Sequence, residues 1–447
     1  MSATGVRAEP AGIAAVLGHL TELQRIADRN GGTRASGTPG HEESVDYVAG
    51  LLTAAGFDVA VREFPITYAE TVAERLVVAG EELEVTVMRY SPNTPPGGIS
   101  APLSVLPPGR TRGCDPADFA DGDHTGRIVL VERGGCPHAR KQQNAAAAGA
   151  AGVLVHNTND EWLLGTLVSD DEARIPTGGV SRVLGERLRT MAGAPVTLDL
   201  RMSSAPRTSR TVIAQTRTGA FDNVVMAGAH LDSVVEGPGI NDAATGCAAL
   251  LETALRLGPN PDVANAVRFA WWGAEEFGQV GSTEYVESRT DEERLDIALY
   301  LNVDMLGSSN GGYFVFSGAD LGDRAPLGCA AIEAAFRDAL AEQGVASEPL
   351  SLVGGFDHMP FVAAGIPAGG LYTGATAIKT PAQAAKWGGT AGIPFDPGYH
   401  RAADDLHNVD RVALAANTAA LAAVTARYAA GTGDLPGRAA RAATRTR

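Results

Sequence analysis

One segment, residues 224–242, places an apolar run, a polar cluster and a helix start in immediate succession. The run VVMAGA is short and apolar, which predicts a buried strand. His230 and Asp232 follow it two residues apart, so their side chains point to the same side of an extended chain. Asp242 comes after a loop that contains Gly and Pro, just before an Ala-rich helix. This order is typical of an α/β active site, and one imidazole with two carboxylates suits zinc.

Taken alone, the same segment also fits a purely structural arrangement. His230 and Asp232 could be a hydrogen-bonded pair at the end of a strand, and Asp242 could be the N-cap of the helix. The rest of the chain is needed to choose between the two interpretations.

Strands and helices alternate in the C-terminal half of the chain. Apolar strands are expected at 264–272, 297–303 and 365–372, and helices at 325–343 and 409–430. The alternation predicts an α/β fold, with a mostly parallel mixed sheet between helices on both faces. The sequence has no G-x-G-x-x-G after a strand, no P-loop and no G-x-S-x-G motif. Nucleotide binding and serine-hydrolase chemistry therefore have no support.

The composition of the chain changes near residue 70. From there to residue 206, Val- and Leu-rich strands are interrupted by Gly and Pro, and no metal-binding or nucleophilic cluster is evident. We predict a β-rich domain over 70–206, inserted between the N-terminal part of the main domain (1–69) and its remainder (207–430). The basic, low-complexity tail 431–447 is expected to be disordered.

The four cysteines form no C-x-x-C motif, which disfavours a cysteine zinc site or a thioredoxin-type redox motif. Cys114 and Cys136 lie within the predicted insertion and could pair in an oxidising compartment. Cys247 and Cys329 lie in apolar helical patterns, so buried free thiols are expected there.

The chain is acidic, with 52 acidic and 36 basic residues and a net charge of −16. This balance argues against a nucleic acid or an anionic membrane as a partner. No stretch approaches the roughly 20 apolar residues that a membrane span needs. The first residues, MSATGVRAEP, lack the pattern of a signal peptide. Either the protein stays inside the cell, or a signal is missing from this sequence.

Further polar residues follow the other predicted strands. Glu275 and Glu276 come after FAWWGA, Asp304 follows strand 297–303, and His400 lies in a late loop. Adjacent glutamates are usually a solvated turn, but beside so apolar a strand two carboxylates would be costly without a cation. Together with His230 and Asp242, these residues could hold two zinc ions, with Asp242 as the bridge.

Four segments carry a resemblance to a known family: AHLDSVVEGPGIND, RFAWWGAEEFG, LNVDMLG and YHRAADDL. In order and residue type they resemble the di-zinc aminopeptidase S / aminopeptidase Y family of zinc exopeptidases, over residues 1–65 and 207–430. Within the insertion, IVLVERGGC, an Ala-rich helix and GVLVHN resemble a protease-associated (PA) domain.

The resemblance implies a role for each site residue. One zinc ion would be held by His230 and Asp304 and the other by Glu276 and His400, with Asp242 bridging both. Three residues would assist catalysis: Glu275 as general base, Asp232 by orienting the imidazole of His230, and Tyr399 by hydrogen-bonding the developing oxyanion.

Residues of the substrate pocket are less clearly marked. Met305 and Tyr372 could line the pocket for the first side chain of the substrate, although core packing fits them equally well. Asp357 lies where the family usually shows Ser-Asp-His or Ser-Asp-Tyr, but here Phe356 precedes it, and a structural role for this loop is favoured.

The function that the resemblance implies is zinc-dependent removal of N-terminal residues from peptides by a secreted enzyme, with a preference for large apolar residues such as Leu. We expect a monomer, although the sequence itself does not reveal the oligomeric state. A carboxypeptidase or dipeptidase on the same scaffold would need basic residues for the substrate carboxylate, and only Arg401 lies beside a site motif. A glutaminyl cyclase-like enzyme would need one zinc ion. A non-catalytic binding protein on this scaffold would be expected to have lost ligands, and all five are present.

Overall fold

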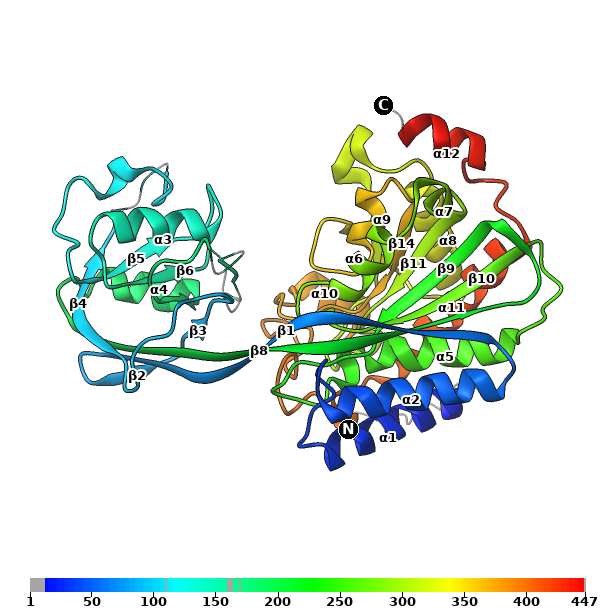
Figure 1. Cartoon of the computed structure of the whole chain (residues 1–447), viewed down its shortest axis with the longest axis horizontal. Helices are drawn as coiled ribbons and strands as arrows, with labels where there is room; N and C mark the ends of the chain where they lie inside the picture. Colours follow the sequence, from blue (N-terminus) through cyan, green and yellow to red (C-terminus); the bar gives the residue numbers. More distant parts are fainter. Residues whose placement is uncertain are drawn as a thin grey trace. The chain divides into compact units, whose positions relative to one another are not determined.

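The computed structural model describes residues 13–107, 109, 111–158, 163, 165–167, 169 and 171–445. The chain forms two compact units (Figure 1). The larger unit contains the residues up to Tyr68 and those from Pro206 onward, and the smaller unit is Ala69–Ala205. Both junctions lie one residue before those expected from the sequence.

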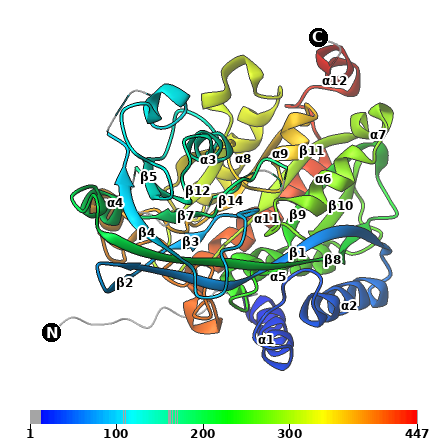
Figure 2. The same ribbon diagram turned by 60° about the vertical axis from the view of Figure 1, so that its left-hand side comes forward.

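The larger unit is built on a mixed sheet in the order β13-β12-β14-β11-β9-β10-β8, with β1 next to β8. Its four central strands run parallel to one another. Strand β8 pairs antiparallel with β10, and β12 pairs antiparallel with β14. The central strands are β9 (Ala220–His230), β10 (Asn265–Trp272), β11 (Ile297–Val303) and β14 (Ala368–Tyr372), and the others are β1 (Asp58–Val78), β8 (Pro195–Gln215), β12 (Phe314–Ser317) and β13 (Glu348–Ser351). Figure 2 shows β9, β10 and β11 side by side.

Helices cover both faces of this sheet. On one face lie α1 (Ile13–Arg29), α2 (Pro39–Ala54), α5 (Thr245–Leu257), α8 (Cys329–Ala341) and α11 (Arg411–Ala430), of which α1, α2 and α5 are grouped below the sheet in Figure 1. On the other face lie α6 (Val280–Glu287) and α9 (Met359–Ala363). Strand β10 supplies both cores, because Phe269 and Trp271 point to the first face and Ala270 and Trp272 to the second. Two short helices, α7 (Asp291–Leu295) and α10 (Pro381–Trp387), lie outside these cores.

The smaller unit has its own sheet, in the order β4-β5-β6-β7-β3, and its own apolar clusters. Its elements are β2 (Glu81–Leu83), β3 (Thr86–Val87), β4 (Ile99–Val105), β5 (Ile128–Glu132), α3 (His138–Ala147), β6 (Gly152–His156), β7 (Thr177–Val180) and α4 (Arg182–Arg189). Strand β4 pairs with the first residues of β8. The long strands β1 and β8 therefore each have residues in both units.

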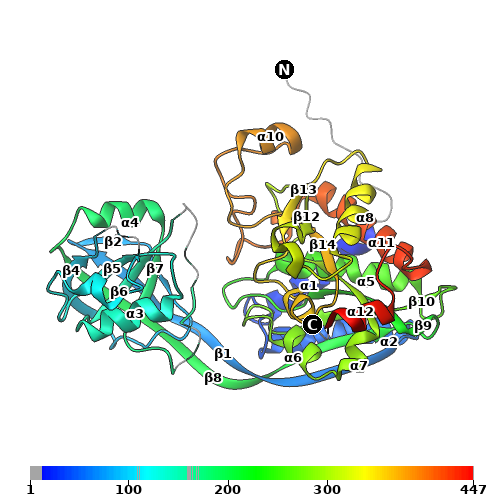
Figure 3. The ribbon, with the colours of Figure 1, turned by 90° about the horizontal axis from the view of Figure 1, so that it is seen from above.

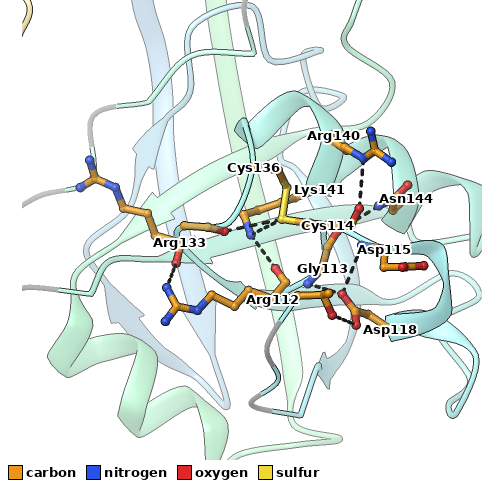
Figure 4. The surroundings of a disulfide bond; sticks show 12 residues. Arg112, Gly113, Cys114, Asp115, Asp118, Arg133, Cys136, Arg140, Lys141 and Asn144 are labelled. Atoms are coloured by element: carbon orange, nitrogen blue, oxygen red, sulfur yellow. Dashed lines mark hydrogen bonds between the residues drawn. A yellow bond between two sulfur atoms is a disulfide. The ribbon is translucent and has the colours of Figure 1, made fainter. Parts of the chain in front are cut away.

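A disulfide joins Cys114 to Cys136 in the smaller unit, which settles the pairing that the sequence left open (Figure 4). Lys141 lies beside it and donates a hydrogen bond to the Arg112 carbonyl at 2.6 Å. Burial lowers the pKa of Lys141 to about 8. The other two cysteines, Cys247 and Cys329, are buried free thiols, as the sequence predicts.

The prediction of a disordered tail is wrong for residues 438–445, which form helix α12 (Arg438–Arg445) close to α7 (Figure 3). Basic side chains anchor this helix. Arg438 pairs with Glu292 and Asp296, and Arg441 is buried and donates to the carbonyl of Leu295 at 2.9 Å. The composition of the tail suggested disorder, because composition does not show that Glu292 and Asp296, more than a hundred residues earlier in the chain, lie beside it.

The described helices include none with the length and apolar character that a membrane crossing requires.

Candidate active site

The polar residues selected from the sequence lie at the carboxyl ends of the parallel strands. His230 is the last residue of β9, Asp304 directly follows β11, and Glu275 and Glu276 lie in the turn that follows the end of β10. Because neighbouring parallel strands end at the same edge, these side chains meet in one buried cluster. His400 reaches the cluster from the loop before α11.

Asp242 stands at the centre of the cluster. Its Oδ1 lies 3.2 Å from Nε2 of His230, and its Oδ2 lies 3.2 Å from Nε2 of His400. Asp304 completes the first group, with Oδ1 at 3.5 Å from Nε2 of His230. Glu276 completes the second group, with Oε2 at 3.1 Å from Nε2 of His400. The five side chains thus form two groups of three ligand atoms that share the carboxylate of Asp242.

The donor set fits metal ions of the zinc type. Ligand atoms of His230, Asp242 and Glu276 all lie within 4.8 Å of one another. Oδ1 of Asp304 is buried and accepts no hydrogen bond within the described part of the chain. Imidazole nitrogen and carboxylate oxygen are ordinary zinc ligands, and buried carboxylates that lack donors are stabilised by a cation.

The charges of the cluster are strongly coupled. Burial raises the pKa of Glu275 well above its ordinary value, and the carboxylates of Asp357 and Glu276 add to the effect. For His230, burial acts against protonation, but the nearby Asp304 and Asp242 outweigh it and raise its pKa well above 6.5. Negative charge therefore dominates the site, which favours a bound cation.

Asp232 was expected to orient the imidazole of His230 through its side chain, but in the structure its backbone carbonyl does so. Nδ1 of His230 lies 3.0 Å from the backbone carbonyl of Asp232, whereas the nearest carboxylate oxygen of Asp232 is 3.8 Å away. The imidazole therefore donates from Nδ1 to a carbonyl, which leaves Nε2 free to ligate a metal. The Asp232 carboxylate instead accepts the backbone N–H of Glu275 at 3.1 Å.

Tyr399 lies directly against the cluster. Its ring stacks on the imidazole of His400, with the ring centroids 3.8 Å apart and an interplanar angle of 18°. Burial raises the pKa of Tyr399 well above 10, and the carboxylates of Asp242 and Glu276 contribute. The hydroxyl thus keeps its proton and remains a hydrogen-bond donor at neutral pH.

The residues suggested for the substrate pocket differ in their surroundings. Met305 is buried, whereas Tyr372 is half-buried and packs against Phe356, with ring centroids 5.2 Å apart. Asp357, which follows Phe356 in the sequence, is buried, and burial raises its pKa to about 7. Ser282 hydrogen-bonds its carboxylate, while Oδ1 has no hydrogen-bond partner within the described residues.

Asp404, which the sequence analysis did not single out, holds the backbone at the bridging carboxylate. Its two oxygens accept the N–H groups of Asn241 at 2.9 Å and Asp242 at 3.0 Å. Asn408 donates a further hydrogen bond to Oδ1 at 3.0 Å. Burial and the neighbouring Asp396 raise the pKa of Asp404 to about 7. The signal was present in the sequence as an acidic pair shortly after His400.

Arg34 was also missed, because no motif in the sequence marks it. It is completely buried. Its guanidinium donates to the backbone carbonyls of Pro238 at 2.9 Å and Gly239 at 2.8 Å, and also to that of Leu231. Arg34 therefore fixes the loop that connects His230 to Asp242.

Comparison with known proteins identifies the family. The model of peptidase family M28 matches residues 211–425. A protein of Mycobacterium tuberculosis named "probable lipoprotein aminopeptidase" is 46% identical over 423 residues, which cover 93% of this chain and 84% of the relative. The chain belongs to peptidase family M28. The PA domain model matches residues 99–188, inside the smaller unit. The family resemblance and the fold class expected from the sequence are thereby confirmed.

Two further comparisons agree with this M28 assignment. Leucine aminopeptidase 2 of Trichophyton rubrum is 38% identical over 421 residues, which cover 93% of this chain and 83% of the relative. The solved structure of a zinc aminopeptidase from Bacillus subtilis is similar with a TM-score of 0.68 and 25% identity, and the match covers 97% of this chain and 98% of that one.

Proposed function

We propose that this M28 peptidase is a zinc aminopeptidase that removes the N-terminal residue from peptides and binds two zinc ions. The observation that carries the proposal is the pair of three-ligand groups that share Asp242. The relatives that match most of the chain are named as aminopeptidases, and a structural neighbour is named as a zinc aminopeptidase.

Each residue of the cluster has a distinct task in this proposal. His230 and Asp304 would hold one zinc ion, Glu276 and His400 the other, and Asp242 both. Bound zinc ions would supply Lewis-acid polarisation of the scissile carbonyl and activation of a water molecule.

The remaining chemistry is carried by protein side chains. Glu275 takes the proton of the attacking water and returns it to the leaving amine, a task for which a buried carboxyl with a raised pKa is suited. Tyr399 keeps its hydroxyl proton and uses it to hydrogen-bond the oxyanion that develops on the substrate carbonyl.

The charge of the site favours an amine over a carboxylate at the substrate terminus. The buried carboxylate of Asp357 lies close enough to Glu275 to raise its pKa, and a free ammonium group would compensate both. A carboxypeptidase needs a cation in this place. The fully buried Arg34 does not supply it, because its guanidinium already donates to three backbone carbonyls.

A preference for large apolar N-terminal residues such as Leu fits the half-buried aromatic pair of Phe356 and Tyr372 next to Asp357. Met305, which is buried, would contribute to the same pocket as a packed side chain.

We further propose that the protein works as a secreted monomer. The Cys114–Cys136 disulfide supports an oxidising compartment, since such bonds are rare in reducing ones. The name of the M. tuberculosis relative, a lipoprotein, is consistent with export.

The function is tested with leucine-p-nitroanilide and its N-acetylated form as paired substrates. The free-amine compound is expected to be cleaved and the acetylated one not. Treatment with a chelator should abolish cleavage, zinc should restore it, and metal analysis should give two zinc ions per chain. A protein that holds two zinc ions but cleaves only substrates with a free C-terminal carboxylate would overturn the aminopeptidase assignment.

A further inference from the structure

We propose that Gln279 is a positioning residue for the general base Glu275, which it holds in the orientation that catalysis requires. The inference rests on the proposed role of Glu275. Nε2 of Gln279 donates a hydrogen bond to Oε1 of Glu275 at 2.9 Å. Among the described residues, no other group donates a hydrogen bond to the Glu275 carboxylate.

The backbone around Glu275 is fixed independently. Its N–H donates to the Asp232 carboxylate at 3.1 Å, and its carbonyl accepts the N–H groups of Gly278 at 2.7 Å and Gln279 at 2.9 Å. These bonds locate the main chain but leave the torsions of the Glu275 side chain undetermined. The side-chain amide of Gln279 supplies the missing constraint.

The turn before α6 brings the Gln279 side chain back over the site. Gln279 has φ +53°, a left-handed conformation that is uncommon for a residue other than Gly, Asn or Asp. Its carbonyl then accepts the N–H of Thr283, at the start of α6. A Cβ atom added at Gly355 would lie 3.5 Å from Nε2 of Gln279. The amide therefore lies between Glu275 and the loop that leads to Asp357, at the border of the substrate site.

An amide is well matched to this task. A carboxylate has two equivalent oxygens and a broad terminal torsion. A donor on Oε1 selects one orientation and leaves Oε2 for the proton of the attacking water. Because small errors in the placement of reacting groups are costly in rate, loss of this donor should slow the chemical step without weakening substrate binding.

The test compares three substitutions in the zinc-loaded, full-length enzyme. Gln279→Leu keeps the approximate volume and removes the donor. Gln279→Asn keeps the amide and is more comfortable in the left-handed region, but it is one methylene too short to reach Glu275. Gln343→Leu is the matched control. It makes the same substitution at a glutamine whose side-chain amide also donates hydrogen bonds, but to the carbonyls of Ala339, at the end of α8, and Ala416, on α11, and to none of the proposed site residues.

On leucine-p-nitroanilide, both Gln279 variants should lose about 10-fold in kcat, with KM, zinc content and melting temperature close to those of the wild type. The Gln343 variant should match the wild type. The Asn variant separates the two possible roles, since a residue needed only for the turn would tolerate Asn. Values of kcat within about twofold of wild type for both Gln279 variants would overturn the inference, as would a loss of zinc that accounts for the loss of activity.

The same series includes wild-type enzyme and Glu275→Gln. An inactive wild type, or a Glu275→Gln variant as active as wild type, would contradict the proposed function itself. An active wild type with an inactive Glu275→Gln variant and unaffected Gln279 variants would contradict only the role of Gln279.

Discussion

Replacing Asp404 with Asn should weaken zinc binding although Asp404 is not one of the proposed ligands. Oδ1 of Asp404 accepts the N–H of Asn241 and the side-chain amide of Asn408, and Oδ2 accepts the N–H of Asp242. In the Asp404→Asn variant, the NH₂ group of the new side chain would face a donor in either of its two orientations. One buried N–H next to the bridging carboxylate would therefore lose its acceptor.

The loss of zinc affinity follows from the free-energy cost of the unpaired N–H. An unpaired buried N–H costs about 1–3 kcal/mol. If the chain relieves this by displacing Asp242, the same free energy appears as a loss of zinc affinity of about 5- to 150-fold. Substitutions of groups that orient metal ligands typically lower affinity by about 10- to 100-fold, which lies within that range.

The measurement is a competition for zinc against a chelator of known affinity. Asp405→Asn is the matched control, because Asp405 caps a short helical turn by accepting the N–H of His407 at 2.7 Å. Asn serves about as well as Asp at such a position. A zinc affinity of the Asp404 variant equal to that of the Asp405 variant would refute the idea that backbone hydrogen bonds at Asp242 hold the metal site in place.

Three further outcomes are expected. Glu275→Gln should lower kcat by about 10²- to 10⁴-fold with unchanged zinc content, and steady-state kinetics with metal analysis would reveal a purely structural role if activity and zinc fell together. Tyr399→Phe should lower kcat on leucine-p-nitroanilide by about 10²-fold, the loss typical of one oxyanion donor, and a kcat equal to wild type would exclude that role. Burial lowers the pKa of His41 to about 4, below the 6.5 of the unfolded chain. Since the unfolded state then binds more protons, stability should fall as the pH drops through this interval, by about 2 kcal/mol between about pH 7.5 and 5. Chemical unfolding of His41→Gln at both pH values should lack that component, and an identical pH dependence would contradict it.

The polar cluster at the sheet edge could be predicted because strand and ligand are adjacent in sequence. Short apolar runs such as FAWW, rich in aromatic residues and followed by Gly, favour buried strands, and parallel neighbours end at one edge. Glu275, Glu276 and Asp304 closely follow such strands, so their meeting with His230 needed no knowledge of long-range packing. His400 lies far from any predicted strand, and its place came from the family resemblance.

Contacts that depend on tertiary packing were not predictable in the same way. The sequence suggested that the Asp232 side chain orients His230, but the backbone carbonyl does so. The basic tail was expected to be disordered, because composition does not show that Arg441 would find the carbonyl of Leu295. The substrate pocket stayed ambiguous for a similar reason, since the sequence does not show that the fold buries Met305 and leaves Tyr372 half-buried.

The loop from His230 to Asp242 shows why a complete set of ligands is not enough to define the site. Arg34, from the N-terminal part of the chain, donates to the carbonyls of Leu231, Pro238 and Gly239. Asp404, from the C-terminal part, accepts the N–H groups of Asn241 and Asp242. Both contacts are made to the backbone, so they impose no pattern on the side chains of the loop itself. The backbone of the loop that carries Asp242 is thus held by two residues that are not among the five proposed ligands. A chain with all five ligands but without Arg34 or Asp404 would keep the ligand set and lose backbone contacts on which the placement of the Asp242 carboxylate between the two groups depends.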